Sequence, residues 1–273
     1  MADDDSEEAA LARAWEERAR SPMQRFFVAS HPGWSDEAAW ERCAWRDAAA
    51  LMFGVGADRL ARARVLEMGC GVGRLARLVA ARAAKYDGFD IAPSMVADAV
   101  RTVAPVAPTA EILVGDGSGP PPPFDERSYD LIYAWAVFIH VSRDIAMRNL
   151  AALVKVLAPD GQLRAQFFAD LTDPTVTRAY FDMDQGPPAF ESLPDDVSVG
   201  ADAEEPGEDA PEVVALTASS EERPDYIGHN WRIDELRAAL EGLGAPGELD
   251  VRLERLEPRI VYALVRRIPS RDR

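Results

Sequence analysis

Hydrophobic and polar positions follow two different periods along most of the chain. A short apolar run at residues 65–66 is followed by Glu67, by a stretch that contains three glycines, and by apolar positions at helical spacing over residues 75–79. A short apolar run predicts a buried strand, and a spacing of three to four residues predicts a helix. Because glycine permits the positive φ of a tight reversal, residues 64–84 are predicted to form a strand, a turn and a helix.

The same alternation continues toward the carboxyl terminus. Apolar runs bounded by turn residues predict further strands, and periodic segments predict helices. The predicted strands are residues 86–90, 110–114, 129–137, 162–169, 249–256 and 260–265. Three helices are predicted, one that begins at Pro93, one at residues 145–157 and one at residues 233–243. A short turn separates the last two strands and favours an antiparallel hairpin. Strands that alternate with helices predict an α/β fold with a mostly parallel sheet.

The first 62 residues are predicted to be helical, mainly at residues 7–20 and 36–51. They hold four of the six tryptophans, which are Trp15, Trp34, Trp40 and Trp45. One interpretation is that these side chains pack the helices onto the main domain. The other is an aromatic cover over a ligand pocket, since such pockets are mostly apolar. The two interpretations are compatible.

Residues 170–229 do not fit the alternation. Between Asp182 and Asp225 the chain carries fourteen acidic side chains against Arg223 as the single basic one. This composition is typical of a solvated, disordered loop. The alternative is a lid over a pocket, with a short hairpin at residues 197–199 and 213–216. The sequence leaves both open.

Composition excludes several classes of function. The formal net charge of −17 opposes binding to nucleic acid, whose phosphates are recognised by Lys and Arg. No apolar run approaches the roughly 18 residues of a membrane span, and the acidic N-terminus is unlike a targeting peptide. We therefore expect a cytoplasmic protein without nucleic-acid or membrane partners. Two cysteines, Cys43 and Cys70, are too few for a disulfide framework or a metal site, and no metal is predicted.

The spacing of the glycines distinguishes two kinds of nucleotide site. A dinucleotide fingerprint requires G-x-G-x-x-G, whose third glycine would fall on Arg74. The chain instead has G-C-G-V-G, preceded by Glu67. About 20 residues further on, Asp90 ends the second predicted strand, where a carboxylate can accept hydrogen bonds from ribose hydroxyls. Asp116 follows the third predicted strand and could accept from an adenine amino group.

Together, VLEMGCGVG, GFD, GD, YDLIYAWAVFIHV and LAPDGQL resemble the motifs of the class I methyltransferases that use S-adenosylmethionine. The resemblance implies a Rossmann-like α/β fold, in which a seven-stranded, mostly parallel sheet has the order 3-2-1-4-5-7-6, an antiparallel last strand and helices on both faces. It also divides the chain. Residues 1–62 become an N-terminal helical cover, residues 63–169 and 230–267 the methyltransferase core, residues 170–229 an acidic insertion or lid, and residues 268–273 a tail.

The resemblance further implies the cofactor S-adenosyl-L-methionine and the residues that bind it. Glu67 is expected to shape the glycine loop and favour the cofactor's ammonium group, Asp90 to hold the ribose and Asp116 to meet the adenine amino group. The methionine part of the cofactor is expected to contact Gly69, Cys70, Gly71 and Trp135. The adenine ring is expected to contact Ile91 and Gly117.

Methyl transfer from a sulfonium removes positive charge from the leaving sulfur, so the protein is expected to contribute mainly alignment and exclusion of water. A general base is required only if the acceptor loses a proton. His140, at the end of the fourth predicted strand, is the best-placed base, and the alternative is that it positions the acceptor or the cofactor loop. His229, at the end of the insertion, ranks second.

The sequence therefore predicts an enzyme that methylates an oxygen or nitrogen of a small organic acceptor, in bacterial specialised metabolism. One alternative is methylation of a peptide or protein side chain, which predicts an open groove in place of a closed lid. Another is a cofactor-binding scaffold protein without turnover. A nicotinamide-dependent dehydrogenase is opposed by the glycine spacing. The oligomeric state is not predicted.

Overall fold

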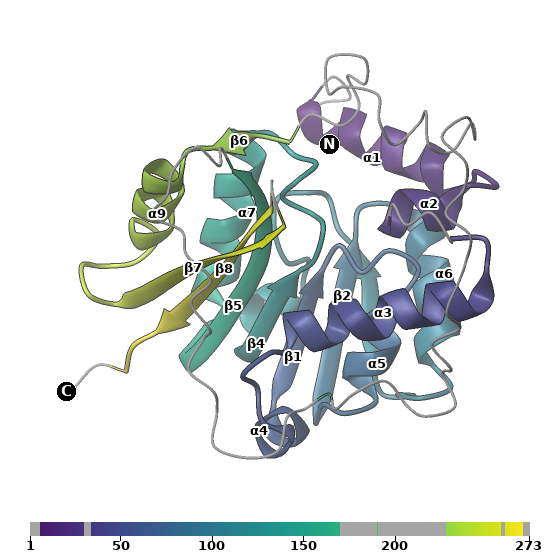
Figure 1. Cartoon of the computed structure of the whole chain (residues 1–273), viewed down its shortest axis with the longest axis horizontal. Coiled ribbons are helices and arrows are strands. Elements are labelled where there is room, and N and C mark those ends of the chain that lie inside the picture. Colours follow the sequence, from purple (N-terminus) through teal and green to yellow (C-terminus); the bar gives the residue numbers. More distant parts are fainter. Residues whose placement is uncertain (1–5, 30–33, 170–189, 191–227, 258–259, 270–273) are drawn as a thin grey trace.

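One sheet carries the fold, and helices cover both of its faces (Figure 1). The computed structural model describes residues 6–29, 34–169, 190, 228–257 and 260–269. The strands are β1 (Arg64–Met68), β2 (Lys85–Asp90), β3 (Glu111–Val114), β4 (Tyr129–Ala134), β5 (Leu157–Ala169), β6 (Asn230–Trp231), β7 (Leu249–Glu257) and β8 (Ile260–Arg267). They follow the order β3-β2-β1-β4-β5-β8-β7, and β6 pairs with β5 beside this path. The strands from β3 to β5 are parallel, whereas β8 is antiparallel to both β5 and β7.

Three of the described helices begin directly after a capping side chain. They are α1 (Glu7–Ala19), α2 (Gln24–Ala29), α3 (Glu37–Leu51), α4 (Ala57–Arg62), α5 (Ala76–Ala80), α6 (Pro93–Val103), α7 (Arg143–Lys155) and α9 (Ile233–Glu241), together with a 3-10 turn at Phe124–Glu126. The side chains of Ser6, Asp36 and Ser142 each accept a hydrogen bond from the backbone N–H three residues further on. These bonds satisfy N–H groups that the first helical turn leaves without an acceptor.

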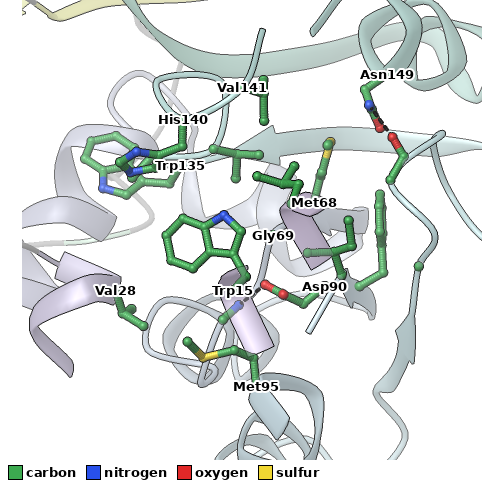
Figure 2. A pocket seen from close by; sticks show the side chains of 18 of the residues that line it. Trp15, Val28, Met68, Gly69, Asp90, Met95, Trp135, His140, Val141 and Asn149 are labelled. Carbon is green, nitrogen blue, oxygen red and sulfur yellow. Dashed lines mark hydrogen bonds between the residues drawn. The ribbon is translucent and has the colours of Figure 1, made fainter. Parts of the chain in front are cut away.

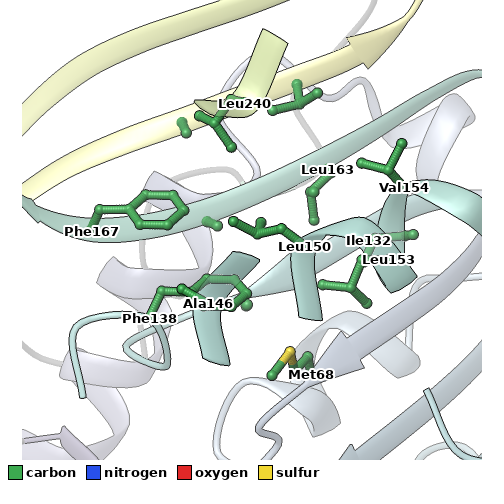
Figure 3. Close-up of a cluster of buried hydrophobic side chains, with 14 of the residues drawn as sticks. Met68, Ile132, Phe138, Ala146, Leu150, Leu153, Val154, Leu163, Phe167 and Leu240 are labelled. Atoms are coloured by element: carbon green, nitrogen blue, oxygen red, sulfur yellow. The ribbon is translucent and has the colours of Figure 1, made fainter. Parts of the chain in front are cut away.

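Alternation along the strands divides the core into two layers. In β4, Ile132 and Ala134 face the layer that α7 and α9 cover, while Leu131 and Tyr133 face the layer that α3, α4 and α5 cover. Figure 3 shows part of the first layer, where Leu150 of α7 packs with Ile132 of the sheet. Because both faces are covered, β4 is apolar on both sides, as a central parallel strand should be.

The end of α3 is anchored to the sheet by buried polar side chains. Arg164, which is 1% exposed, donates hydrogen bonds to the backbone carbonyls of Leu51 at 2.6 Å and Phe53 at 2.8 Å. The hydroxyl of Tyr262 on β8 also donates to the Leu51 carbonyl, at 2.6 Å. These bonds satisfy carbonyls that the helix end leaves without a donor.

The predicted fold class is confirmed. The sheet has the predicted order, with β7 and β8 in the places of predicted strands six and seven. The prediction omitted β6, because two residues are too few for a strand pattern. The division of the chain into cover, core, insertion and tail stays a prediction.

Three predicted boundaries are wrong. The fourth strand ends at Ala134, three residues early, because Ala136 adopts a φ of 56° that an extended strand does not allow. The helix after the glycines shrinks to the five residues of α5, because residues 71–75 form turns. The fifth strand already begins at Leu157.

The insertion, including the hairpin predicted at residues 197–199 and 213–216, lies outside the described residues except for Phe190. The Phe190 ring packs edge-on against Trp45, with 5.6 Å between ring centroids. Within the described ranges, no helix is long and apolar enough to span a bilayer.

Candidate functional site

A cavity lies between the carboxyl ends of β1, β2 and β4 and the N-terminal helices α1 and α2 (Figure 2). It contains about 810 Å³ of empty space, including its open mouth. Its lining side chains are mostly apolar or aromatic, and Asp90 is the one acidic side chain among the described residues that line it. Crevices at this edge of an α/β sheet are the usual place for ligands.

Asp90 lies midway along the cavity, and two backbone groups hold its carboxylate. The N–H of Gly71 donates to Oδ2 at 2.8 Å, and the N–H of Ala92 donates to Oδ1 at 2.9 Å. Burial raises the pKa of Asp90, while these donors oppose the shift. Since each carboxylate oxygen can accept about two hydrogen bonds, both oxygens retain capacity for neighbouring hydroxyl groups of a ligand.

The glycine turn brings bare backbone to the cavity wall. Gly69 and Gly71 both line the cavity and have φ values of 71° and 52°. The N–H of Gly69 donates to the Phe89 carbonyl at 2.8 Å, which ties the turn to β2. A Cβ on Gly69 would overlap Cγ2 of Val137, well inside the 3.0 Å that real Cβ atoms keep. Glycine is therefore required there both for φ and for space.

Two other residues of the turn face away from the cavity. Gly73 has a φ of 82°, and a Cβ there would lie 3.0 Å from the Cα of Ala99, so this glycine packs the turn against α6. Cys70 is buried, and it is not among the residues that line the cavity. Its backbone N–H donates to the carbonyl of residue 89 at 3.1 Å, and burial raises the pKa of its thiol well above the ordinary value. A contact between this residue and a cofactor stays a prediction.

Glu67 lies in the core beneath the turn, outside the cavity wall. Its Oε2 accepts hydrogen bonds from the hydroxyl of Tyr133, at 2.7 Å, and from that of Tyr86. Burial raises the pKa of Glu67 to about 7, although the two tyrosine donors oppose the shift. The carboxyl group is therefore placed to support the loop from below. The expected contact with a ligand's ammonium group stays a prediction.

One end of the cavity is formed by Ile91, Gly117 and Asn149. Ile91 packs closely on Gly117, because a Cβ on the glycine would lie 3.0 Å from its Cδ1. Asp116 precedes this glycine but is not among the lining residues. Its Oδ1 accepts from the N–H of Ser118 at 2.9 Å and from the Ser118 hydroxyl at 2.5 Å, and these bonds lower the pKa of Asp116.

The other end of the cavity is aromatic. Trp135 and His140, from the loop after β4, line it together with Trp15 of α1 (Figure 2). The rings of Trp15 and His140 meet edge to face, with 5.4 Å between their centroids. Burial, with a smaller contribution from the charge of Arg18, lowers the pKa of His140 to about 4. The imidazole is therefore neutral at physiological pH.

The loop after β4 is held in a strained conformation. Ala136 has a φ of 56°, which is uncommon for a residue with a Cβ. Its N–H donates to Oε1 of Gln166, a buried side chain of β5, at 2.8 Å. Strained backbone of this kind collects at binding and catalytic sites, and here it turns residues 135–137 onto the cavity wall.

His229 lies behind the cavity wall. Its backbone N–H donates to the carbonyl of Val141, a lining residue, at 3.2 Å. Its ring packs edge-on against Trp231 with 4.6 Å between centroids, and its Nε2 lies 3.8 Å from Oε1 of Glu235. The two predicted catalytic histidines are therefore in different surroundings, and of the two His140 is the one that lines the cavity. Catalysis by either stays a prediction.

Helix α1 bridges the cavity between two elements of the core. Near its start, Glu8 bonds to Arg148 of α7. Near its end, Glu16 accepts from the N–H and the hydroxyl of Ser94 at 2.9 and 2.6 Å, at the start of α6. Trp15 lies beside this second contact and faces the cavity. Of the four N-terminal tryptophans, Trp15 is the one that lines the cavity. The aromatic-cover interpretation stays a prediction.

Asn149 and Gln166 were not predicted from the sequence. Each is an uncharged polar residue within a longer helix or strand, and neither belongs to a motif. Asn149 is fully buried and Gln166 is 5% exposed. A polar side chain at a buried periodic position is the one signal in the sequence that could have singled them out.

Part of the chain matches a known protein family. Residues 65–161 match a family model described as a methyltransferase domain. No curated protein matches the chain.

Solved structures share the fold at low sequence identity. Magnesium protoporphyrin IX methyltransferase from Synechocystis PCC 6803, with bound SAH, has a TM-score of 0.60 and 13% identity, covering 96% of this chain and 100% of its own. Phosphoethanolamine N-methyltransferase 1 from Haemonchus contortus, in complex with phosphoethanolamine and S-adenosylhomocysteine, has a TM-score of 0.59 and 15% identity, covering 97% of this chain and 50% of its own. The N-methyltransferase NodS from Bradyrhizobium japonicum WM9, in complex with S-adenosylhomocysteine, has a TM-score of 0.54 and 14% identity, covering 94% of this chain and 98% of its own.

Proposed function

We propose that the chain is a class I methyltransferase that uses S-adenosylmethionine, and that it methylates an oxygen or nitrogen of a small organic acceptor in the cavity beneath α1. The observation that carries the proposal is the form of the cavity. A half-buried carboxylate lies midway along it, bare glycine backbone lies beside that carboxylate, and an aromatic end lies beyond. The first two features suit the cofactor, and the third suits an acceptor.

The residues present fit the cofactor. In this proposal, the oxygens of Asp90 that Gly71 and Ala92 hold in place accept hydrogen bonds from the ribose hydroxyls. Ile91 packs on the adenine, and the methionine part lies along Gly69, where no Cβ obstructs it. When bound, S-adenosylmethionine supplies an electrophilic methyl group on a positively charged sulfur.

The aromatic end favours a small acceptor over a peptide. Trp15 and Trp135 enclose this end, and the bonds from Ser94 to Glu16 hold α1 beside it. A peptide acceptor would require an open groove at this place. Two similar structures are named for small acceptors, phosphoethanolamine and magnesium protoporphyrin IX. The apolar wall suits an acceptor with an aromatic or aliphatic face.

Catalysis in this proposal rests on alignment. Two reactants held in line gain about 7–11 kcal/mol over reactants that meet in solution. Trp15, Trp135 and the strained loop around Ala136 hold the acceptor and exclude water. His140 is neutral and weakly basic because its pKa is about 4, so it accepts a hydrogen bond and positions the acceptor. This favours the positioning alternative over the general base.

Cofactor binding is tested first, by calorimetry with S-adenosylhomocysteine. We expect the wild-type protein to bind it and Asp90→Ala to lose most of the affinity, since this substitution removes the carboxylate at the centre of the cavity. Asp98→Ala is the matched control, because Asp98 lies on α6 and bonds to Gln24 and Arg101 outside the cavity. Affinity that is unchanged in Asp90→Ala would refute the ribose contact.

The acceptor is tested next, by mass spectrometry of candidate small molecules and peptides incubated with the enzyme and S-adenosylmethionine. A methyl gain on small molecules supports the proposal. A methyl gain on peptides alone contradicts it. Binding of the cofactor without any methylated product would favour the scaffold alternative.

A further inference from the structure

Asn149 places a buried acceptor at the end of the cavity opposite the aromatic residues. The side chain is 0% exposed, and it lines the cavity. Its Nδ2 donates to the Gly117 carbonyl at 2.7 Å and to the Ile145 carbonyl at 2.9 Å. Its Oδ1 is buried and has no hydrogen-bond partner among the described residues. A buried amide oxygen without a donor is uncommon in native proteins and calls for an explanation.

The orientation of the amide is determined by its partners. Both groups close to Nδ2 are carbonyl oxygens, which can accept but cannot donate. Turning the amide over would place Oδ1 against two oxygens, so the nitrogen must be where it stands. The oxygen is therefore the free end of the amide, and it requires a donor.

The position of Asn149 in the cavity indicates which ligand group supplies that donor. Asp90 lies between Asn149 at one end and Trp135 and His140 at the other (Figure 2). If Asp90 holds the ribose and the glycine turn holds the methionine part, the base of the nucleoside extends to the end where Asn149 lies. An adenine presents an N–H donor there, on its exocyclic amino group.

The predicted acceptor for this amino group was Asp116. That carboxylate is exposed and outside the cavity wall, and its Oδ1 already accepts two hydrogen bonds from Ser118. Asn149 differs in position, since it is buried and lines the cavity, and its Oδ1 is without a partner among the described residues.

We propose that Oδ1 of Asn149 accepts a hydrogen bond from the exocyclic amino group of the cofactor's adenine, and that this contact selects adenine over a 6-oxo purine. The inference rests on the proposed function, because it assumes that a nucleoside of this cofactor occupies the cavity. Nδ2 of the same side chain holds the Gly117 carbonyl. One residue thus recognises the base and fixes the loop after β3 against α7.

The test compares two ligands by calorimetry, S-adenosylhomocysteine and S-inosylhomocysteine. The second carries an oxygen in place of the amino group, so it offers an acceptor where Asn149 also offers one. Leaving a buried polar group without its partner weakens binding by about 10- to 100-fold. We expect the wild-type protein to prefer the adenosyl ligand by about that factor. Equal affinity for the two ligands overturns the proposal without any variant.

Two substitutions separate recognition from support of the loop. Asn149→Leu removes both the acceptor and the donor to Gly117, and we expect it to lose most of the preference between the ligands. Asn149→Asp keeps an acceptor oxygen and lacks the amide donor, and we expect it to retain the preference. A purely structural role would lower the affinity for both ligands equally in both variants, and that result overturns the proposal.

Asp116→Ala tests whether Asp116, in place of Asn149, recognises the amino group. We expect it to keep the preference, and loss of the preference there with retention in Asn149→Leu would assign the amino group to Asp116 instead. Failure of the cofactor assignment looks different, because the wild-type protein would then bind neither ligand. Failure of the acceptor assignment alone appears in the methylation assay and leaves this comparison of the two ligands unaffected. If Asn149→Leu does not fold, the wild-type comparison and the Asn149→Asp and Asp116→Ala variants still decide the outcome.

Discussion

Gly69 is the position where the shape of the glycine turn is most open to a quantitative test. Its φ of 71° lies in the left-handed region, and a Cβ on it would overlap Cγ2 of Val137. The substitution Gly69→Ala therefore introduces two separate penalties. The first is conformational and depends on φ, and the second is steric and depends on one methyl group of a neighbouring side chain.

The two penalties have different magnitudes. A residue with a Cβ in the left-handed region loses about 1–2 kcal/mol. Forcing an extra methyl group into a packed site costs about 1–3 kcal/mol. We expect Gly69→Ala to lower the free energy of unfolding by about 2–5 kcal/mol, which is the combined range of these two effects. Because Gly69 lines the cavity, we also expect it to weaken binding of S-adenosylhomocysteine.

Urea unfolding of four proteins separates the effects: wild type, Gly69→Ala, Val137→Ala and the double variant. Val137→Ala removes the methyl group that the new Cβ overlaps, so the double variant should recover the steric part and keep the conformational part. Gly247→Ala is the matched control, because Gly247 has a φ of 78° and a Cβ on it would meet no atom of the described residues within 4 Å. If Gly69→Ala destabilises the protein no more than Gly247→Ala, or if Val137→Ala recovers nothing, the steric argument is refuted.

Two further predictions concern titratable groups. The pKa of Glu67 is raised to about 7 from an ordinary 4.5, so the folded state binds the proton more tightly and stability falls as pH rises from 4.5 to 7, by at most on the order of 3 kcal/mol. We expect Glu67→Gln to remove this decrease in the free energy of unfolding measured by urea titration at about pH 5 and 8, and an equal decrease in both proteins would contradict the assignment. His140, with a pKa of about 4, stays neutral from about pH 6 to 9, so His140→Phe should lower kcat with little change in affinity for S-adenosylhomocysteine. We also expect the dependence of kcat on pH over that range to have the same shape in His140→Phe as in the wild type. An ionisation that is present in the wild-type profile and absent from that of the variant would support the general-base role.

The sequence predicted those parts of the site that are encoded by local spacing. The glycine turn and Asp90 belong to one strand-turn-helix-strand unit, and a hydrogen bond between Gly71 and Asp90 spans only 19 positions. The alternation of side chains along β1 also predicts which way Glu67 faces. Leu66 and Met68 face one layer of the core, so the acid between them must face the other. The motif alone directed Glu67 toward the ligand, and the alternation places it in the core.

Asn149 and the aromatic end depend on tertiary contacts. Asn149 of α7 bonds to the carbonyl of Gly117, which lies 32 positions away on the loop after β3. The loop after β4 leaves the strand early because Gln166 of β5 holds Ala136. Patterns within single elements carry no information on such pairings, because each partner is an ordinary residue in its own segment.

The N-terminal helices supply one wall of the cavity, and this arrangement has an evolutionary consequence. Leu11 and Trp15 of α1 and Phe27 and Val28 of α2 line the cavity, yet they belong to no strand of the sheet. Substitutions at these positions change the wall of the cavity without shifting the register of any strand. The shape of the cavity can therefore diverge among descendants of such a chain while the sheet that supports it is inherited unchanged.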